Sequence, residues 1–149
     1  MKRIVDLVGR MFGWLSKNEW IPILLVRICI GYFFFIDGKG KLTHLDKVTE
    51  YFESLGIPMP HLNALLTGAT QCFGGIFLIL GLGARIFAGM LAVVMLVAIK
   101  SAKMEEVKSV FDFVGLQEWA FFLFFVWIGF AGAGKASIDH LLAKRLRKE

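Results

Sequence analysis

Four long apolar runs constrain what this chain can fold into. Arg27 is the only charged residue inside them. A membrane-spanning helix needs about 20 apolar residues, because each residue adds about 1.5 Å toward a hydrocarbon core of roughly 30 Å. The runs cover residues 20–36, 62–82, 86–99 and 119–133. With flanking residues that extend the shorter runs, the predicted spans are residues 20–39, 62–82, 84–102 and 117–133.

The composition favours the same class of protein. Hydrophobic residues make up 57% of the chain and charged residues only 19%. The alternative, a soluble protein with four core helices, would leave too little polar surface to face water. We therefore expect an all-α, integral membrane four-helix bundle that forms a single domain over residues 1–149.

The basic residues carry information about orientation. The formal net charge is +5, but no basic and aromatic stripe of the kind that binds nucleic acid is evident. Four spans place both termini on one face, which holds ten basic residues against six on the other. The ten are Lys2, Arg3, Arg10, Lys17, Arg85, Lys135, Lys144, Arg145, Arg147 and Lys148. By the positive-inside rule, we expect both termini in the cytoplasm.

Two segments outside the spans have helical periodicity but are too polar to insert. Residues 3–17 place apolar side chains on one side and basic ones on the other, which predicts an interfacial helix on anionic lipid. Between the first two spans, Thr43 begins a capping-box-like sequence, and apolar residues recur at helical spacing up to Gly56. We expect this second amphipathic helix to lie across the outer mouth of the bundle.

Arg27 is the residue that most needs an explanation, because it lies about 10 Å along the first span if Trp20 marks the interface. It could reach back to lipid phosphates, or it could face the bundle interior and hold a polar group. The interior is favoured because Arg27, Gly31, Phe34, Gly38 and Lys41 share one stripe of the helix. Small residues let helix backbones approach, so we also expect close packing at Gly31, Gly38, Gly68 and Gly75 and at Ala84, Ala88 and Ala92.

Other polar groups in the apolar runs are few. Gln71 is the one strongly polar residue deep within the second span. Its estimated depth differs from that of Arg27 by about 6–8 Å, a gap that an arginine side chain or one water can close, so we expect the two residues to share a polar pocket. At the end of the first span, Asp37 can pair with Lys39 or Lys41. Cys29 and Cys72 have similar depths, which suggests a redox dithiol, although the helical wheel directs them away from each other. The three histidines lack metal-ligand spacing, so no metal site is expected.

Four motifs in order resemble the DoxX family of small bacterial membrane proteins. They are the stripe from Arg27 to Leu42, then "FESLGIPMP", "GGIFLILGLGARIFAGMLAVVMLVAI" and "GAGKASIDHLL". The resemblance implies a four-span bundle in the bacterial inner membrane. It also implies a link to quinol oxidase and thiosulfate:quinone oxidoreductase, or to soluble redox and detoxification partners.

One position departs from the family pattern. Relatives often carry a glutamate before the Gly-Gly of the second span, where this chain has Gln71 in "TQCFGG". An amide forms hydrogen bonds but does not take up a proton from a quinol, which weakens a proton-coupled role. Arg27, Lys41 and Asp139 match the pattern and are candidate functional or architectural positions. For Asp139 the architectural alternative is a place in the first turn of a helix capped by Ser137.

Three functions remain open from the sequence. The first is a redox-associated subunit that binds a quinone or similar amphiphile, with Arg27 and Gln71 on its head and Phe33, Phe34, Phe35 and Trp127 near its ring. The chain has no haem or iron–sulfur ligand set, so catalysis would need a partner oxidoreductase. The second is a non-enzymatic assembly or chaperone-like subunit, which could also form a homo-oligomer. A small transporter is the third.

Overall fold

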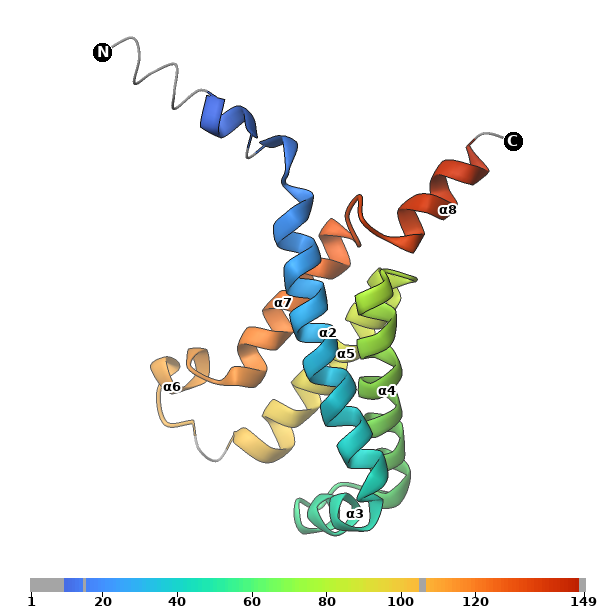
Figure 1. Ribbon diagram of the computed structural model, residues 1–149. Coiled ribbons are helices and arrows are strands. Elements are labelled where there is room, and N and C mark those ends of the chain that lie inside the picture. The colour runs from blue at the N-terminus through green and yellow to red at the C-terminus, as the bar shows by residue number, and fades with distance from the viewer. Residues whose placement is uncertain (1–9, 15, 105–106, 148–149) are drawn as a thin grey trace.

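Long helices account for most of the structure. The computed structural model describes residues 10–14, 16–104 and 107–147, and these residues contain helices and no strand (Figure 1). The expected all-α class is therefore confirmed. The elements are α2 (Trp20–Thr43), α3 (Leu45–Ser54), α4 (Pro60–Leu80), α5 (Ala84–Ala98), the π-helix η1 (Ile99–Lys103), α6 (Val110–Val114), α7 (Gln117–Ala131) and α8 (Ile138–Leu146).

Three helical stretches are long and apolar enough to cross a membrane. They are α2, α4 and the continuous stretch Ala84–Lys103, which joins α5 to η1. The apolar helix α7 has 15 residues, and its rise of about 22 Å is shorter than a typical hydrocarbon core. The described residues thus contain three span-length helices and a shorter apolar fourth.

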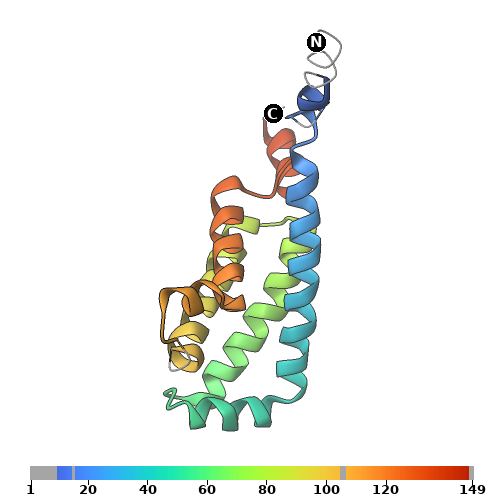
Figure 2. The same ribbon diagram turned by 90° about the vertical axis from the view of Figure 1, so that its left-hand side faces the viewer.

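Glycines determine how α2 and α4 pack. A methyl group added to Gly31 would lie 2.8 Å from the carbonyl oxygen of Gly75, and one added to Gly38 would lie 2.7 Å from that of Gly68. Such distances leave no room for any side chain, so the two backbones touch. The close packing predicted from these glycines is confirmed, and α2 and α4 run side by side along their length (Figure 2).

The helices α5 and α7 form a second closely packed pair. Ala84, Ala88 and Leu91 of α5 are fully buried, as are Phe125 and Ile128 of α7, and all five belong to one hydrophobic core. Phe34 of α2 joins the two pairs, since its ring centroid lies 5.1 Å from that of Phe121 and 5.0 Å from that of Phe125.

The connection between α2 and α4 differs in part from the prediction. The helix α2 does not end near residue 39 but continues to Thr43. Thr43 does not cap α3, because its hydroxyl donates to the carbonyl of Lys39 within α2. Instead α3 starts after His44 without a side-chain cap, crosses one end of the α2/α4 pair (Figure 2) and ends before Gly56, whose φ is +68°.

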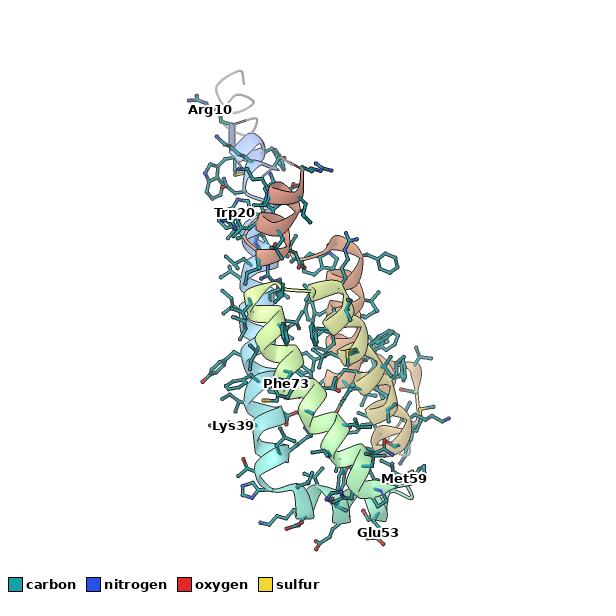
Figure 3. The ribbon with its side chains drawn as sticks, turned by 90° about the vertical axis from the view of Figure 1, so that its right-hand side faces the viewer. Arg10, Trp20, Lys39, Glu53, Met59 and Phe73 are labelled. Carbon is teal, nitrogen blue, oxygen red and sulfur yellow. The ribbon has the colours of Figure 1, made fainter. Side chains whose placement is uncertain are left out.

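The predicted interfacial helix at residues 3–17 lies largely outside the described residues. Of this segment, residues 10–14 and 16–17 are described, and they are helical. The exposed side chains of Met11, Phe12 and Trp14 lie there beside Arg10. Arg10 and Trp20 lie at one end of the molecule, and Glu53 and Met59 lie at the other (Figure 3).

Candidate functional site

Arg27 faces the interior, as predicted, and its side chain is only 1% exposed. Its Nε donates to the carbonyl of Leu78 at 2.9 Å and its Nη2 to that of Ile79 at 3.0 Å, both in the last turn of α4. Its Nη1 donates to the carbonyls of Ala133 and Ala136 in the loop after α7. Carbonyls at a helix C-terminus lack partners within the helix and carry partial negative charge. Arg27 therefore joins the ends of α4 and α7 to α2.

Asp139, in the first turn of α8, makes a second set of contacts at the helix ends. Its carboxylate accepts from the backbone N–H groups of Gly83 at 2.8 Å and Ala84 at 3.2 Å, where α5 begins. A carboxylate at a helix N-terminus satisfies orphan donors and complements the helix dipole. The backbone N–H of Asp139 also donates to the carbonyl of Gly81 at 3.0 Å. Asp139 thus holds the α4–α5 turn to the start of α8.

Ser137 and Gly81 fill the space between these two charged side chains. The Ser137 hydroxyl accepts from the N–H of His140, so the predicted cap of α8 is confirmed. A side chain on Gly81, whose φ is +67°, would lie 2.6 Å from Cβ of Ser137. We call Arg27, Gly81, Ser137 and Asp139 the terminal clamp, because together they join α2, the α4–α5 turn and the α7–α8 loop.

The structure does not bring Arg27 and Gln71 together, so the shared pocket predicted for them is wrong. Gln71 precedes Leu78, the carbonyl partner of Arg27, by seven residues of α4, which is about 10 Å of helical rise. Helical side chains lean toward the N-terminus of their own helix, and in α2 that direction leads to the terminal clamp. The guanidinium consequently reaches loop carbonyls and moves farther from Gln71.

A cavity of about 470 Å³ lies instead between the helix pairs, on the side where α3 crosses. Its aromatic lining comes from α2, α3 and α7, namely Phe33, Phe34, Tyr51, Phe52 and Phe121. Its polar lining includes Asp37, Lys41, Thr67, Thr70 and Gln71. Asp37, Lys41 and Gln71, three of the four principal residues predicted for the site, therefore line the same cavity. Arg27, the fourth, does not line it.

Gln71 is the unusual group on this wall. Its side chain is 3% exposed, and its Oε1 has no hydrogen-bond partner among the described residues. A buried polar atom without a partner costs about 1–3 kcal/mol, so native structures normally satisfy it. The amide therefore has hydrogen-bonding capacity that the described part of the protein does not use.

Asp37 and Lys41 form an ion pair across one turn of α2, as the sequence suggested. Their side chains are 36% and 25% exposed, respectively, so the pair lies at the edge of the cavity and not in its enclosed part.

The π-helix η1 contributes Ser101, Ala102 and Lys103 to the lining of the cavity. π-Helical turns are rare and occur frequently at functional sites, and no sequence signal pointed to this one.

The other predicted residues lie elsewhere. Cys29 is exposed, Cys72 is partly buried, and both are free thiols. Neither cysteine lines the cavity, and Phe35 and Trp127 also lie outside its lining. Phe121 of α7 takes the place expected for Trp127. Within the described ranges, no group of three or more His, Cys, Asp or Glu side chains is placed to hold a metal ion.

Apolar helices of spanning length define an α-helical membrane protein, and an open cavity lies between them. The chain belongs to the DoxX family, whose sequence model matches residues 23–104. A relative from Bacillus subtilis (strain 168), described as "Putative oxidoreductase CatD", is 28% identical over 120 residues, which cover 80% of this chain and 84% of that protein. No solved structure matches the chain.

Proposed function

We propose that this DoxX protein is a redox-associated membrane subunit whose cavity binds a quinone or a similar small amphiphile for a partner oxidoreductase. The observation that carries the proposal is the buried Oε1 of Gln71, which has no hydrogen-bond partner among the described residues and belongs to a side chain that lines the cavity. Because Oε1 only accepts hydrogen bonds, a hydroxyl of a quinol, the reduced form of a quinone, would satisfy it. The description of the Bacillus relative as an oxidoreductase supports the redox association.

The cavity has the size and chemistry that such a ligand needs. Small-molecule sites commonly enclose about 300–1,000 Å³ and combine apolar walls with a few polar groups. The volume here, about 470 Å³, suits a one- or two-ring head. Phe34 and Phe121 would contact the ring, and Oε1 of Gln71 would accept a hydrogen bond from a ring hydroxyl of the reduced head group.

The role of the chain itself is binding and positioning. A quinone, when bound, supplies the two-electron redox chemistry. Catalysis then requires electrons from a partner protein, because the sequence carries no ligand set for a haem or an iron–sulfur cluster. Gln71 holds the head group in place, while a carboxylate at this position would also exchange protons.

The same proposal includes the arrangement in the membrane. Residues 1–149 form one domain of the bacterial inner membrane, in which α7 completes a four-helix bundle with α2, α4 and α5. Both termini lie in the cytoplasm, where the excess of basic residues favours them. The N-terminal segment, residues 3–17, lies along the inner surface, and α3 lies across the outer mouth of the cavity.

Binding to purified protein in lipid nanodiscs tests the proposal. A short-tailed naphthoquinone and its reduced naphthoquinol are titrated anaerobically by calorimetry, and lipids extracted from the purified protein are analysed for quinones by mass spectrometry. Gln71→Leu removes one hydrogen bond worth about 0.5–1.5 kcal/mol, so this variant should bind the naphthoquinol roughly 2- to 13-fold more weakly than the wild type. Phe73→Leu is the control on the same helix, because Phe73 is 55% exposed and lies outside the cavity lining.

Two results would contradict the proposal. One is the absence of saturable binding and of co-purified quinone in a folded wild-type protein. The other is equal affinity of the wild type and Gln71→Leu. If a partner protein nevertheless co-purifies in stoichiometric amounts, the assembly-subunit function takes precedence.

A further inference from the structure

The C-terminal helix α8 has a surface that the rest of the described protein leaves uncovered. None of its residues is buried. Leu141, Leu142 and Leu146 are 62%, 47% and 74% exposed. In Figure 1, α8 extends away from the helix pairs at the end of the molecule where α2 begins. Three exposed leucines on one short helix require a partner that the described residues do not provide.

Positively charged side chains lie close to these leucines in the sequence. Lys144, Arg145 and Arg147 lie in the same short segment, and its one acidic residue, Asp139, is engaged with the start of α5. Ile138, Leu141, Leu142, Lys144 and Arg145 line a hollow on the surface of the helix. Apolar side chains beside two cations match the two parts of an anionic phospholipid, an acyl chain and a phosphate.

The terminal clamp holds the start of α8 at the end of a span-length helix. The span-length helix α4 has 21 residues and rises about 31 Å, which matches a hydrocarbon core of roughly 30 Å. Its end is marked by Gly81, whose carbonyl accepts from the N–H of Asp139 at 3.0 Å. The first turn of α8 is therefore hydrogen-bonded to the residue that follows a span-length helix, and helices of that length end near the lipid head groups.

We propose that α8 lies on the membrane surface and binds anionic phospholipids, with its leucines in the acyl region and Lys144, Arg145 and Arg147 on the phosphates. Each basic residue near an anionic surface favours the docked state by about fivefold. The proposal depends on the position of α8 and on its own side chains. It is independent of the cavity and its ligand.

Spin labels on opposite faces of α8 test this in the full chain. Leu142→Cys and His140→Cys are labelled separately in a Cys29→Ser, Cys72→Ser background, because the two side chains lie about 160° apart on the helix. The proteins are reconstituted in nanodiscs of phosphatidylcholine with or without phosphatidylglycerol. Collision with oxygen reports bilayer exposure of each label, and collision with a water-soluble nickel complex reports water exposure.

The expected result is that the label at position 142 lies in the bilayer and the label at position 140 in water when phosphatidylglycerol is present. Replacing Lys144, Arg145 and Arg147 together by Gln should lower the ratio of docked to free helix up to about 100-fold. Water exposure of both labels in anionic discs would overturn the proposal and favour a soluble protein as the occupant. Equal docking with and without phosphatidylglycerol would overturn the lipid specificity.

Discussion

Replacing Arg27 with methionine should destabilise the fold strongly and leave the cavity intact. The substitution removes donors from the carbonyls of Leu78, Ile79, Ala133 and Ala136. Leu78 keeps a bond from the N–H of Gly81, so up to three of the four carbonyls are left without a donor. At about 1–3 kcal/mol for each unsatisfied buried acceptor, with some relief from water near the membrane surface, we expect a loss of roughly 3–5 kcal/mol.

The assay is reversible unfolding in mixed micelles, followed by far-ultraviolet circular dichroism as the denaturing detergent is increased. Arg85→Met is the matched control, because Arg85 is an exposed arginine in the first turn of α5, next to the terminal clamp. A surface substitution of this kind should change the free energy of unfolding by less than about 0.5 kcal/mol. Unchanged stability of Arg27→Met together with lost naphthoquinone binding would refute the reasoning and restore Arg27 as a ligand-binding residue.

Two further predictions follow from the helix contacts and use the same unfolding assay. Gly38→Ala should cost about 1–3 kcal/mol or more, because the added methyl group meets the backbone of α4 at Gly68 and Cys72. Gly40→Ala, which meets nothing within 4 Å, is the control, and equal stability of the two variants would contradict close packing of the backbones. Asp139→Asn should cost about 0.5–2 kcal/mol through weaker capping of α5. Asp112→Asn is its control for a helix N-terminus away from the clamp, since Asp112 is the N3 residue of the capping box that Ser109 begins on the short helix α6.

Local spacing was sufficient to predict several contacts. The stripe that begins at Arg27 faces inward because a helix repeats every 3.6 residues, whatever its neighbours are. Asp37 and Lys41 pair because residues four apart adjoin on any helix. Ser137 caps α8 for an equally local reason, since its hydroxyl is within reach of the N–H three residues later.

The partners of Arg27 and Gln71 depended on relations between helices. Estimating depth along two separate helices assumed where each one meets the membrane, and small errors in both estimates add. The lean of the Arg27 side chain and the short helix α7 brought the loop carbonyls of Ala133 and Ala136 within reach. Gln71 was left with Asp37, Lys41 and the aromatic rings around the cavity.

The sequence by itself determined that this chain forms apolar helices with an inward glycine stripe, because hydrophobicity and helical periodicity are properties of each segment alone. Only the tertiary structure decided that Arg27 and Asp139 act at helix ends and that a cavity forms beside Gln71. Those outcomes depend on how two helix pairs are tilted and rotated against each other. That geometry results from side chains distant in sequence packing together, such as Phe34 against Phe121.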